Sequence, residues 1–147
     1  MISIVIDTNI IVAALQNKGG VARSILRLCL SGHLQAVMGA ALFAEYEDVL
    51  SRDLLFKDSK LNKQERENVL NGFLSVCKWC EVFYAWRPNL PDEADNHLIE
   101  LAIAGRADFI ITRNLRDLTK GELIFDHLQI VGPEYFLEIL NQYKESK

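Results

Sequence analysis

The sequence has few cysteines and no long apolar run. Three cysteines in 147 residues are too few, and odd in number, for a disulfide framework, so a reducing compartment is favoured. No apolar stretch approaches the ~20 residues of a membrane-spanning helix. The first apolar stretch, 2–6, is too short for a secretion signal and has no basic residues before it. We therefore expect a cytoplasmic protein without a membrane segment.

Positive charge is also scarce. The chain has 16 Lys and Arg against 20 Asp and Glu, which gives a net charge of −4. This balance argues against broad electrostatic capture of nucleic acid but permits a local site. Half of the residues are apolar, which excludes disordered and low-complexity classes. The length and the lack of linkers and repeats predict a single domain, 1–147.

Short apolar segments alternate with helical patterns along the chain. The expected strands are 2–6, 34–38, 80–84, 108–112 and 128–131. The expected helices are 9–16, 20–31, 40–54, 62–78, 93–105 and 133–145. This alternation predicts an α/β fold, a three-layer α/β/α sandwich with a mostly parallel five-stranded sheet.

Several residues mark expected helix ends. Asn62 and Glu65 have the spacing of a capping box at the start of the fourth helix. Gly32, Gly105 and Gly132 fall just before strands or between elements, where glycine is expected to end helices.

Acidic residues stand at three places that the predicted fold would bring together. Asp7 directly follows the first strand, and ligands of open α/β sheets bind beyond the carboxyl ends of the strands. Asp95 lies on the apolar face of its predicted helix, so its carboxylate is expected to point toward the sheet. Glu45 lies at the edge of the apolar stripe of the third helix. The sequence thus predicts three clustered carboxylates.

Each of these acids also has an ordinary structural explanation. Asp7 can be the N-cap of the next helix. Asp95 can belong to a capping box that Asp92 begins, and Glu45 can be a solvated charge at the edge of its helix. Taken together, however, clustered carboxylates repel one another unless a cation neutralises them.

The residue types indicate which cation and which chemistry. Oxygen ligands without a nearby His or Cys favour Mg²⁺ or Mn²⁺ over Zn²⁺, and such an ion promotes phosphodiester hydrolysis. Aspartyl-phosphate chemistry is disfavoured, because Asn9 stands where that chemistry needs a second Asp and Arg113 where it needs a Lys. The three histidines show no ligand spacing and receive no role.

Three segments, VIDTNI, LFAEYEDVL and PDEADNHLIELAIAGRADFIITRN, resemble the PIN-domain family in order and spacing over nearly the whole chain. Within that family the chain resembles the VapC-like toxin–antitoxin ribonucleases. The resemblance implies an endoribonuclease that depends on Mg²⁺ or Mn²⁺, acts on RNA, pairs with a cognate antitoxin protein and forms a homodimer. The family's catalytic and metal-binding acids fall on Asp7, Glu45 and Asp95.

The resemblance also assigns supporting residues. The small hydroxyl and amide positions of the family correspond to Thr8, Asn9 and Thr112. Independently of the resemblance, Arg113 and Arg116 lie near the end of the fourth strand and are candidates for holding RNA phosphates, with Arg113 the better placed. Both can also be ordinary solvated surface residues.

One position departs from the family pattern. Many members carry a fourth acid where this chain has Asn114. The amide oxygen remains a candidate metal ligand, but one negative charge is missing, for which Asp92 or Asp117 could compensate. The departure keeps an alternative open, a catalytically weak or inactive PIN-like domain that binds RNA or protein.

Overall fold

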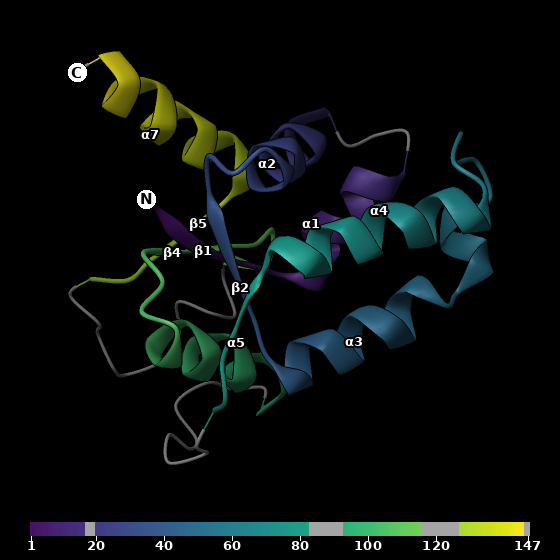
Figure 1. Cartoon of the computed structure of the whole chain (residues 1–147), viewed down its shortest axis with the longest axis horizontal. Helices are drawn as coiled ribbons and strands as arrows, with labels where there is room; N and C mark the ends of the chain where they lie inside the picture. Colours follow the sequence, from purple (N-terminus) through teal and green to yellow (C-terminus); the bar gives the residue numbers. More distant parts are fainter. Residues whose placement is uncertain (17–19, 83–92, 116–126, 146–147) are drawn as a thin grey trace.

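The computed structural model describes residues 1–16, 20–82, 93–115 and 127–145, with side chains for all of these except 93–96 and 144–145. Figure 1 shows the chain, and its elements occur in the following order: β1 (Ser3–Ile6), α1 (Thr8–Leu15), α2 (Gly20–Leu30), β2 (Gln35–Met38), α3 (Ala40–Leu50), the 3₁₀ turn η1 (Asp53–Phe56), α4 (Lys63–Val76), β3 (Lys78–Trp79), α5 (Glu93–Ala104), β4 (Phe109–Ile111), β5 (Gln129–Val131) and α7 (Pro133–Glu145).

The strands form a parallel five-stranded sheet in the order β3-β2-β1-β4-β5. β1 lies at the centre, where Ile4 pairs with Ala36 of β2 and with Phe109 of β4. In Figure 1, α5 lies on one side of the sheet and α2 and α7 lie on the other. The predicted α/β architecture with a parallel sheet is therefore confirmed.

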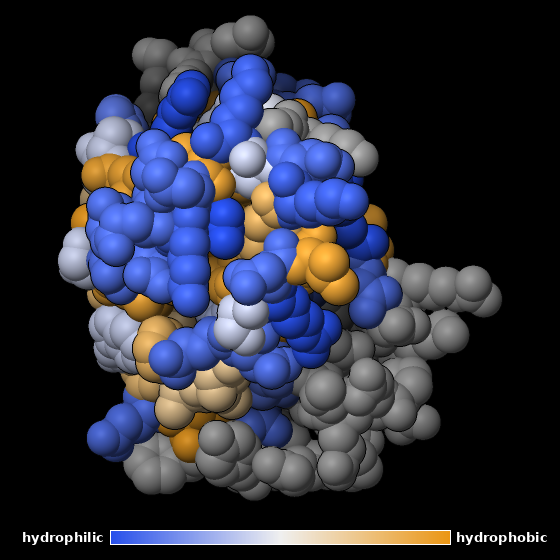
Figure 2. Space-filling view, turned by 90° about the vertical axis from the view of Figure 1, so that its right-hand side faces the viewer, coloured by the Kyte–Doolittle hydropathy of each residue, from blue (hydrophilic) through white to orange (hydrophobic). Residues whose placement is uncertain are grey.

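The central strands form because their residues suit burial on both faces. Ile4, Val5 and Ile6 of β1 and all of β4 are buried, and a continuous run of β-branched and apolar residues is typical of strands covered by helices on both sides. None of the described helices is long and apolar enough to span a membrane. The face shown in Figure 2 is mostly hydrophilic, with hydrophobic areas between the polar ones.

The edge strand β3 differs from the prediction. The expected strand was 80–84, but the structure places it at Lys78–Trp79, and the described residues 80–82 are not part of it. α4 ends at Val76, so the chain reaches the sheet early and Lys78 pairs with Val37. Both residues of β3 are exposed, so this edge strand lacks the apolar pattern that marks a buried strand. The other four strands lie within their predicted ranges.

Two helix ends also differ from the prediction. α3 ends at Leu50, and η1 covers the remainder of the segment 40–54. After α5, Arg106 and not Gly105 adopts the left-handed conformation, with φ 54°. Gly32, with φ 83°, ends α2 as expected. The capping box is also confirmed, since Asn62 Oδ1 accepts from Glu65 N at 2.8 Å and Glu65 Oε1 from Asn62 N at 3.0 Å.

Gly105 is needed for close packing. A Cβ atom at this position would lie 2.4 Å from Val37 Cγ1 and 3.3 Å from the Leu101 carbonyl oxygen. Val37 is buried in β2, and a β-branched side chain has few other rotamers to adopt. The absence of a side chain at Gly105 therefore lets the end of α5 approach the sheet.

We expect Gly105→Ala to lower the free energy of unfolding by about 1–3 kcal/mol, the usual cost of overpacking a core. Gly72→Ala is the matched control, because its nearest contact would be Leu30 Cδ2 at 3.8 Å in the interior of α4. This control should stabilise the protein by up to about 1 kcal/mol through helix propensity. Urea denaturation measures both, and equal stability of the two variants would contradict the packing role.

Candidate active site

The candidate site begins where β1 and β4 end. Asp7 N donates to the Ile111 carbonyl at 3.0 Å, and Thr112 N donates to the Val131 carbonyl at 3.0 Å. These bonds continue the sheet by one residue and set Asp7 beside Thr112. The Thr112 hydroxyl then donates to Asp7 Oδ2 at 2.6 Å. The carboxylate therefore lies at the carboxyl ends of the parallel strands, where the sequence predicted it.

Asp7 is also the N-cap residue of α1, the structural role that the sequence allowed for it. Asp7 Oδ1 accepts from Thr8 N at 2.7 Å. A cap at the surface would leave its other oxygen in water, but Asp7 is only 8% exposed and Oδ2 is bound as well. The carboxylate is thus fixed at both oxygens.

Glu45 of α3 reaches the same place through Thr8. The Thr8 hydroxyl donates to Glu45 Oε1 at 2.6 Å, while the backbone N–H of Thr8 donates to Asp7. Thr8 therefore bridges two carboxylates that lie 38 positions apart in the chain. The neighbouring Tyr46 fixes α3 in place, because its fully buried hydroxyl donates to the Ile6 carbonyl at 2.5 Å.

His97 is a site residue that sequence reasoning missed. Its Nε2 lies 2.8 Å from Glu45 Oε2, and its Nδ1 is buried without a hydrogen-bond partner among the described residues. His97 belongs to α5, which packs against α3. The sequence holds no spacing signal for this pair, because only the packing of two helices far apart in the chain brings the residues together.

The two carboxylates have opposite electrostatic environments. Burial raises the pKa of Asp7 above its ordinary value, and the nearby Glu45 charge adds to this, although bonds from Thr112 and Thr8 oppose it. The hydrogen bond from His97 lowers the pKa of Glu45. Neighbouring acids whose pKa values are pushed apart are typical of functional sites.

The donor set fits a hard divalent cation. Asp7 and Glu45 offer oxygen atoms, and hydrogen bonds from their neighbours orient these oxygens, as outer partners orient metal ligands. The expectation of a site without a nearby His was wrong, because His97 lies beside Glu45, with its Nε2 bound to that carboxylate. Mg²⁺ is often held by one or two carboxylates, with water and phosphate completing its ligands. Within the described part of the chain no group of three His, Cys, Asp or Glu side chains could hold a metal, and the side chain of Asp95 lies outside that part.

Two amide residues join the network. Asn9 Nδ2 donates to Asp7 Oδ2 at 3.3 Å, and its Oδ1 accepts from Arg113 N at 3.4 Å. The backbone N–H of Asn114 donates to the Thr112 hydroxyl at 2.9 Å. The structure thus connects Asp7 with Asn9 and Thr112 directly and with Asn114 through Thr112.

Arg113 joins this network through its backbone N–H, whereas its side chain is paired elsewhere. The Arg113 guanidinium contacts Glu134 of α7, with Nη2 3.0 Å from Oε1, and both side chains are about half exposed. Arg113 would have to leave this ion pair to hold a phosphate. The side chain of Asp95 is not described, although its backbone lies in the first turns of α5. Asp92, Arg116 and Asp117 lie outside the described residues.

Comparison with known proteins places the chain in a family. No curated protein matches it. Among solved structures, one chain of VapBC2 from Rickettsia felis, bound to a DNA fragment from their promoter, aligns with a TM-score of 0.59. The alignment has 17% sequence identity and covers 89% of this chain and 98% of that chain, so it supports the fold. The PIN domain family matches residues 3–116, well over half of the sequence, and the chain therefore belongs to the PIN domain family.

Proposed function

We propose that this protein is a metal-dependent endoribonuclease that hydrolyses RNA phosphodiester bonds. The observation that carries the proposal is the Thr8 bridge, which holds the Asp7 and Glu45 carboxylates side by side at the strand ends of a PIN domain. PIN domains are generally nucleases. The site offers hard oxygen ligands beside a surface where α3 and α5 meet, as metal-assisted phosphodiester hydrolysis requires.

In this proposal Asp7, Glu45 and Asp95 hold Mg²⁺ or Mn²⁺, with Asn114 as a neutral oxygen ligand. When bound, such an ion polarises a phosphoryl oxygen and makes water a better nucleophile. Thr8 and Thr112 orient the carboxylates, since each hydroxyl donates to one carboxylate oxygen. Asp92 and Asp117 are further candidate acids.

Residues around the metal ligands have supporting roles. His97 holds Glu45 in one orientation through Oε2. Arg113 and Arg116 are the candidates for an RNA phosphate, and Arg113, the better placed in sequence, would exchange its ion pair with Glu134 for the phosphate. Asn9 binds both Asp7 and the backbone of residue 113, so it keeps the ends of β1 and β4 together.

We further propose that the protein is the toxin of a cytoplasmic toxin–antitoxin pair and acts as a single-domain homodimer. The likeness to a VapBC2 chain supports an antitoxin protein as its partner. α2 and the α4 region, both amphipathic in sequence, are the candidate partner surfaces. Asn114 favours a second candidate, a catalytically weak or inactive domain that binds RNA or protein, because it removes one charge from the proposed metal site.

We expect Asp7→Asn to lower the rate of RNA cleavage by more than about 100-fold. Loss of a residue that only supports a metal ligand typically lowers activity by about 10- to 100-fold, and loss of the ligand itself should cost more. The substitution keeps the shape of the side chain and removes its charge. Asp48→Asn is the matched control, because this acid lies on the exposed side of α3 in an ion pair with Arg52. Cleavage of labelled RNA in Mn²⁺ buffer measures both, and full activity of Asp7→Asn would refute the proposed site.

In chelator, the same Asp7→Asn variant should melt at a higher temperature than the wild type near neutral pH. The folded state binds a proton at Asp7 more tightly than the unfolded chain, because the pKa of Asp7 is raised. Asp7 thus favours folding most below its ordinary pKa, and this contribution is lost as the pH rises through the raised pKa. The advantage of the variant should therefore shrink as the pH is lowered toward about 4. A variant that is less stable than the wild type at neutral pH would contradict this electrostatic account.

Asn114→Asp should tighten Mn²⁺ binding about tenfold, since an added carboxylate near a divalent ion contributes on the order of 1–2 kcal/mol. It should also lower stability in chelator, because the added carboxylate is not neutralised. Asn68→Asp on the exposed face of α4 makes the same charge change away from the site. Calorimetric titration and melting curves measure both effects. Unchanged affinity and stability would mean that residue 114 does not face the metal.

A further inference from the structure

We infer that the cavity beside the carboxylates holds one unstacked base of the RNA, next to the bond that is cleaved, with Trp79 as its stacking surface. This inference rests on the proposed action on RNA. It adds a binding site for the nucleobase to the site for the phosphate, and it names a residue that the catalytic network does not contain.

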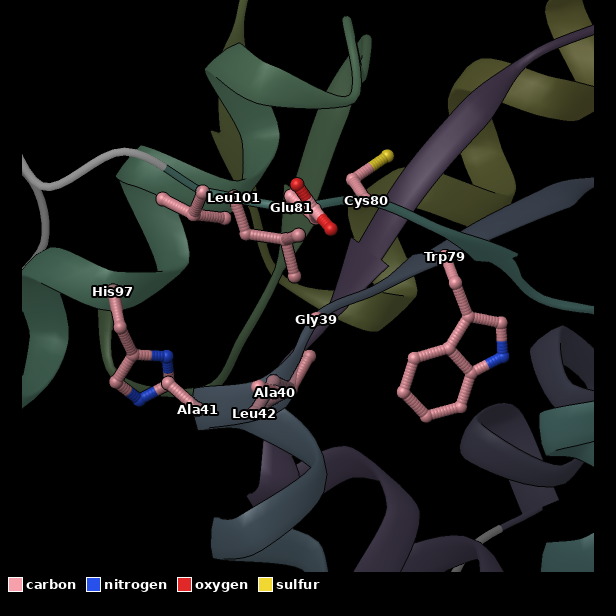
Figure 3. A pocket seen from close by; sticks show the side chains of 10 residues that line it. Gly39, Ala40, Ala41, Leu42, Trp79, Cys80, Glu81, His97 and Leu101 are labelled. Carbon is pink, nitrogen blue, oxygen red and sulfur yellow. The ribbon is translucent and has the colours of Figure 1, made fainter.

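The cavity lies between the start of α3, the end of β3 and one side of α5. Its volume is about 600 Å³, within the roughly 300–1,000 Å³ of small-molecule sites. Figure 3 shows Trp79 and His97 on opposite sides of the cavity, with Gly39 and Ala40 between them. Most of the lining is apolar or small, as a flat aromatic ligand requires.

The cavity borders the candidate active site directly. His97 forms part of its wall and, through Nε2, binds Glu45 Oε2 at 2.8 Å. Glu45 is joined to Asp7 through Thr8. A nucleotide whose phosphate lies at the carboxylates therefore has a cavity within reach for its base.

Trp79 is suited to stacking because it is both exposed and held in place. It is 50% exposed. Its Nε1 donates to the Leu74 carbonyl at 3.3 Å, and its ring meets Phe43 edge to face with centroids 5.6 Å apart. Binding would therefore lose little conformational entropy at this side chain, because it is already held in place. Aromatic rings stack on unstacked bases without strong sequence preference.

The charges of the lining favour a base over a phosphate. Among the described residues that line the cavity there is no Lys or Arg, whereas Glu81 contributes a carboxylate. A carboxylate repels phosphate but accepts hydrogen bonds from the amino and imino groups of bases. The phosphate thus belongs at the proposed metal site and the base belongs in the cavity.

The test measures binding of short single-stranded RNA to the Asp7→Asn variant in Mn²⁺, so that cleavage does not interfere. We expect Trp79→Leu in this background to raise the Kd about 5- to 100-fold, the loss that removal of a stacking ring produces. Trp79→Phe keeps an aromatic face and should restore most of the affinity. Tyr143→Leu is the matched control, because Tyr143 is about as exposed and lies on α7.

RNA with one abasic position identifies the occupant. One such oligonucleotide should bind the Asp7→Asn protein about as weakly as the intact RNA binds the Trp79→Leu protein, and the two changes should not add, because they remove the same contact. The inference would be overturned if the effects of the abasic position and of Trp79→Leu added fully at every position of the RNA, or if Trp79→Leu left the affinity for RNA unchanged. The cavity would then be left for a protein partner.

These outcomes separate the inference from the proposed function. Cleavage that depends on Asp7 without any effect of Trp79 would uphold the nuclease and refute the base site. RNA binding that depends on Trp79 in a protein that does not cleave RNA would refute the nuclease and uphold the base site. A protein that binds no RNA would refute both.

Discussion

Burial of the Asp7 carboxylate at the end of the central strand is the constraint on which the rest of the site depends. A buried carboxylate is costly unless its oxygens are hydrogen-bonded. Here the backbone of α1 binds one oxygen and Thr112 binds the other. These bonds fix where α1 begins and how the ends of β1 and β4 meet. Thr8, the first residue of α1, is then in position to bind Glu45.

The two acids of the site have different surroundings, which shift their pKa values in opposite directions. Asp7 lies in the core layer, where burial raises its pKa. Glu45 lies at the rim, where His97 lowers its pKa. A divalent cation would favour the charged form of both groups, and so would offset the cost that burial imposes on Asp7. Folding thus places a buried carboxylate with a raised pKa beside one whose pKa is lowered.

The edge strand β3 forms part of the cavity next to the site. β3 joins β2 two residues earlier than the apolar pattern indicated, and this register places Trp79 within the lining of the cavity that His97 also borders. Gly39 lets α3 begin there close to α5, because a Cβ atom would lie 2.9 Å from Leu101 Cδ1. The register of β3 therefore determines that Trp79 lines the cavity that His97 borders.

Three features follow from the order of residues alone: the parallel α/β fold, the position of Asp7 at a strand end and the candidacy of Glu45. Apolar periodicity encodes burial, and burial fixes strands, helices and the residues that follow them. Other features emerge only once the chain is folded: His97 binds Glu45, Arg113 pairs with Glu134, Gly105 serves packing, and β3 begins at Lys78. These features depend on contacts between segments far apart in the chain, and periodicity, which reports only how each segment faces the core, carries no information about which distant side chain it will meet.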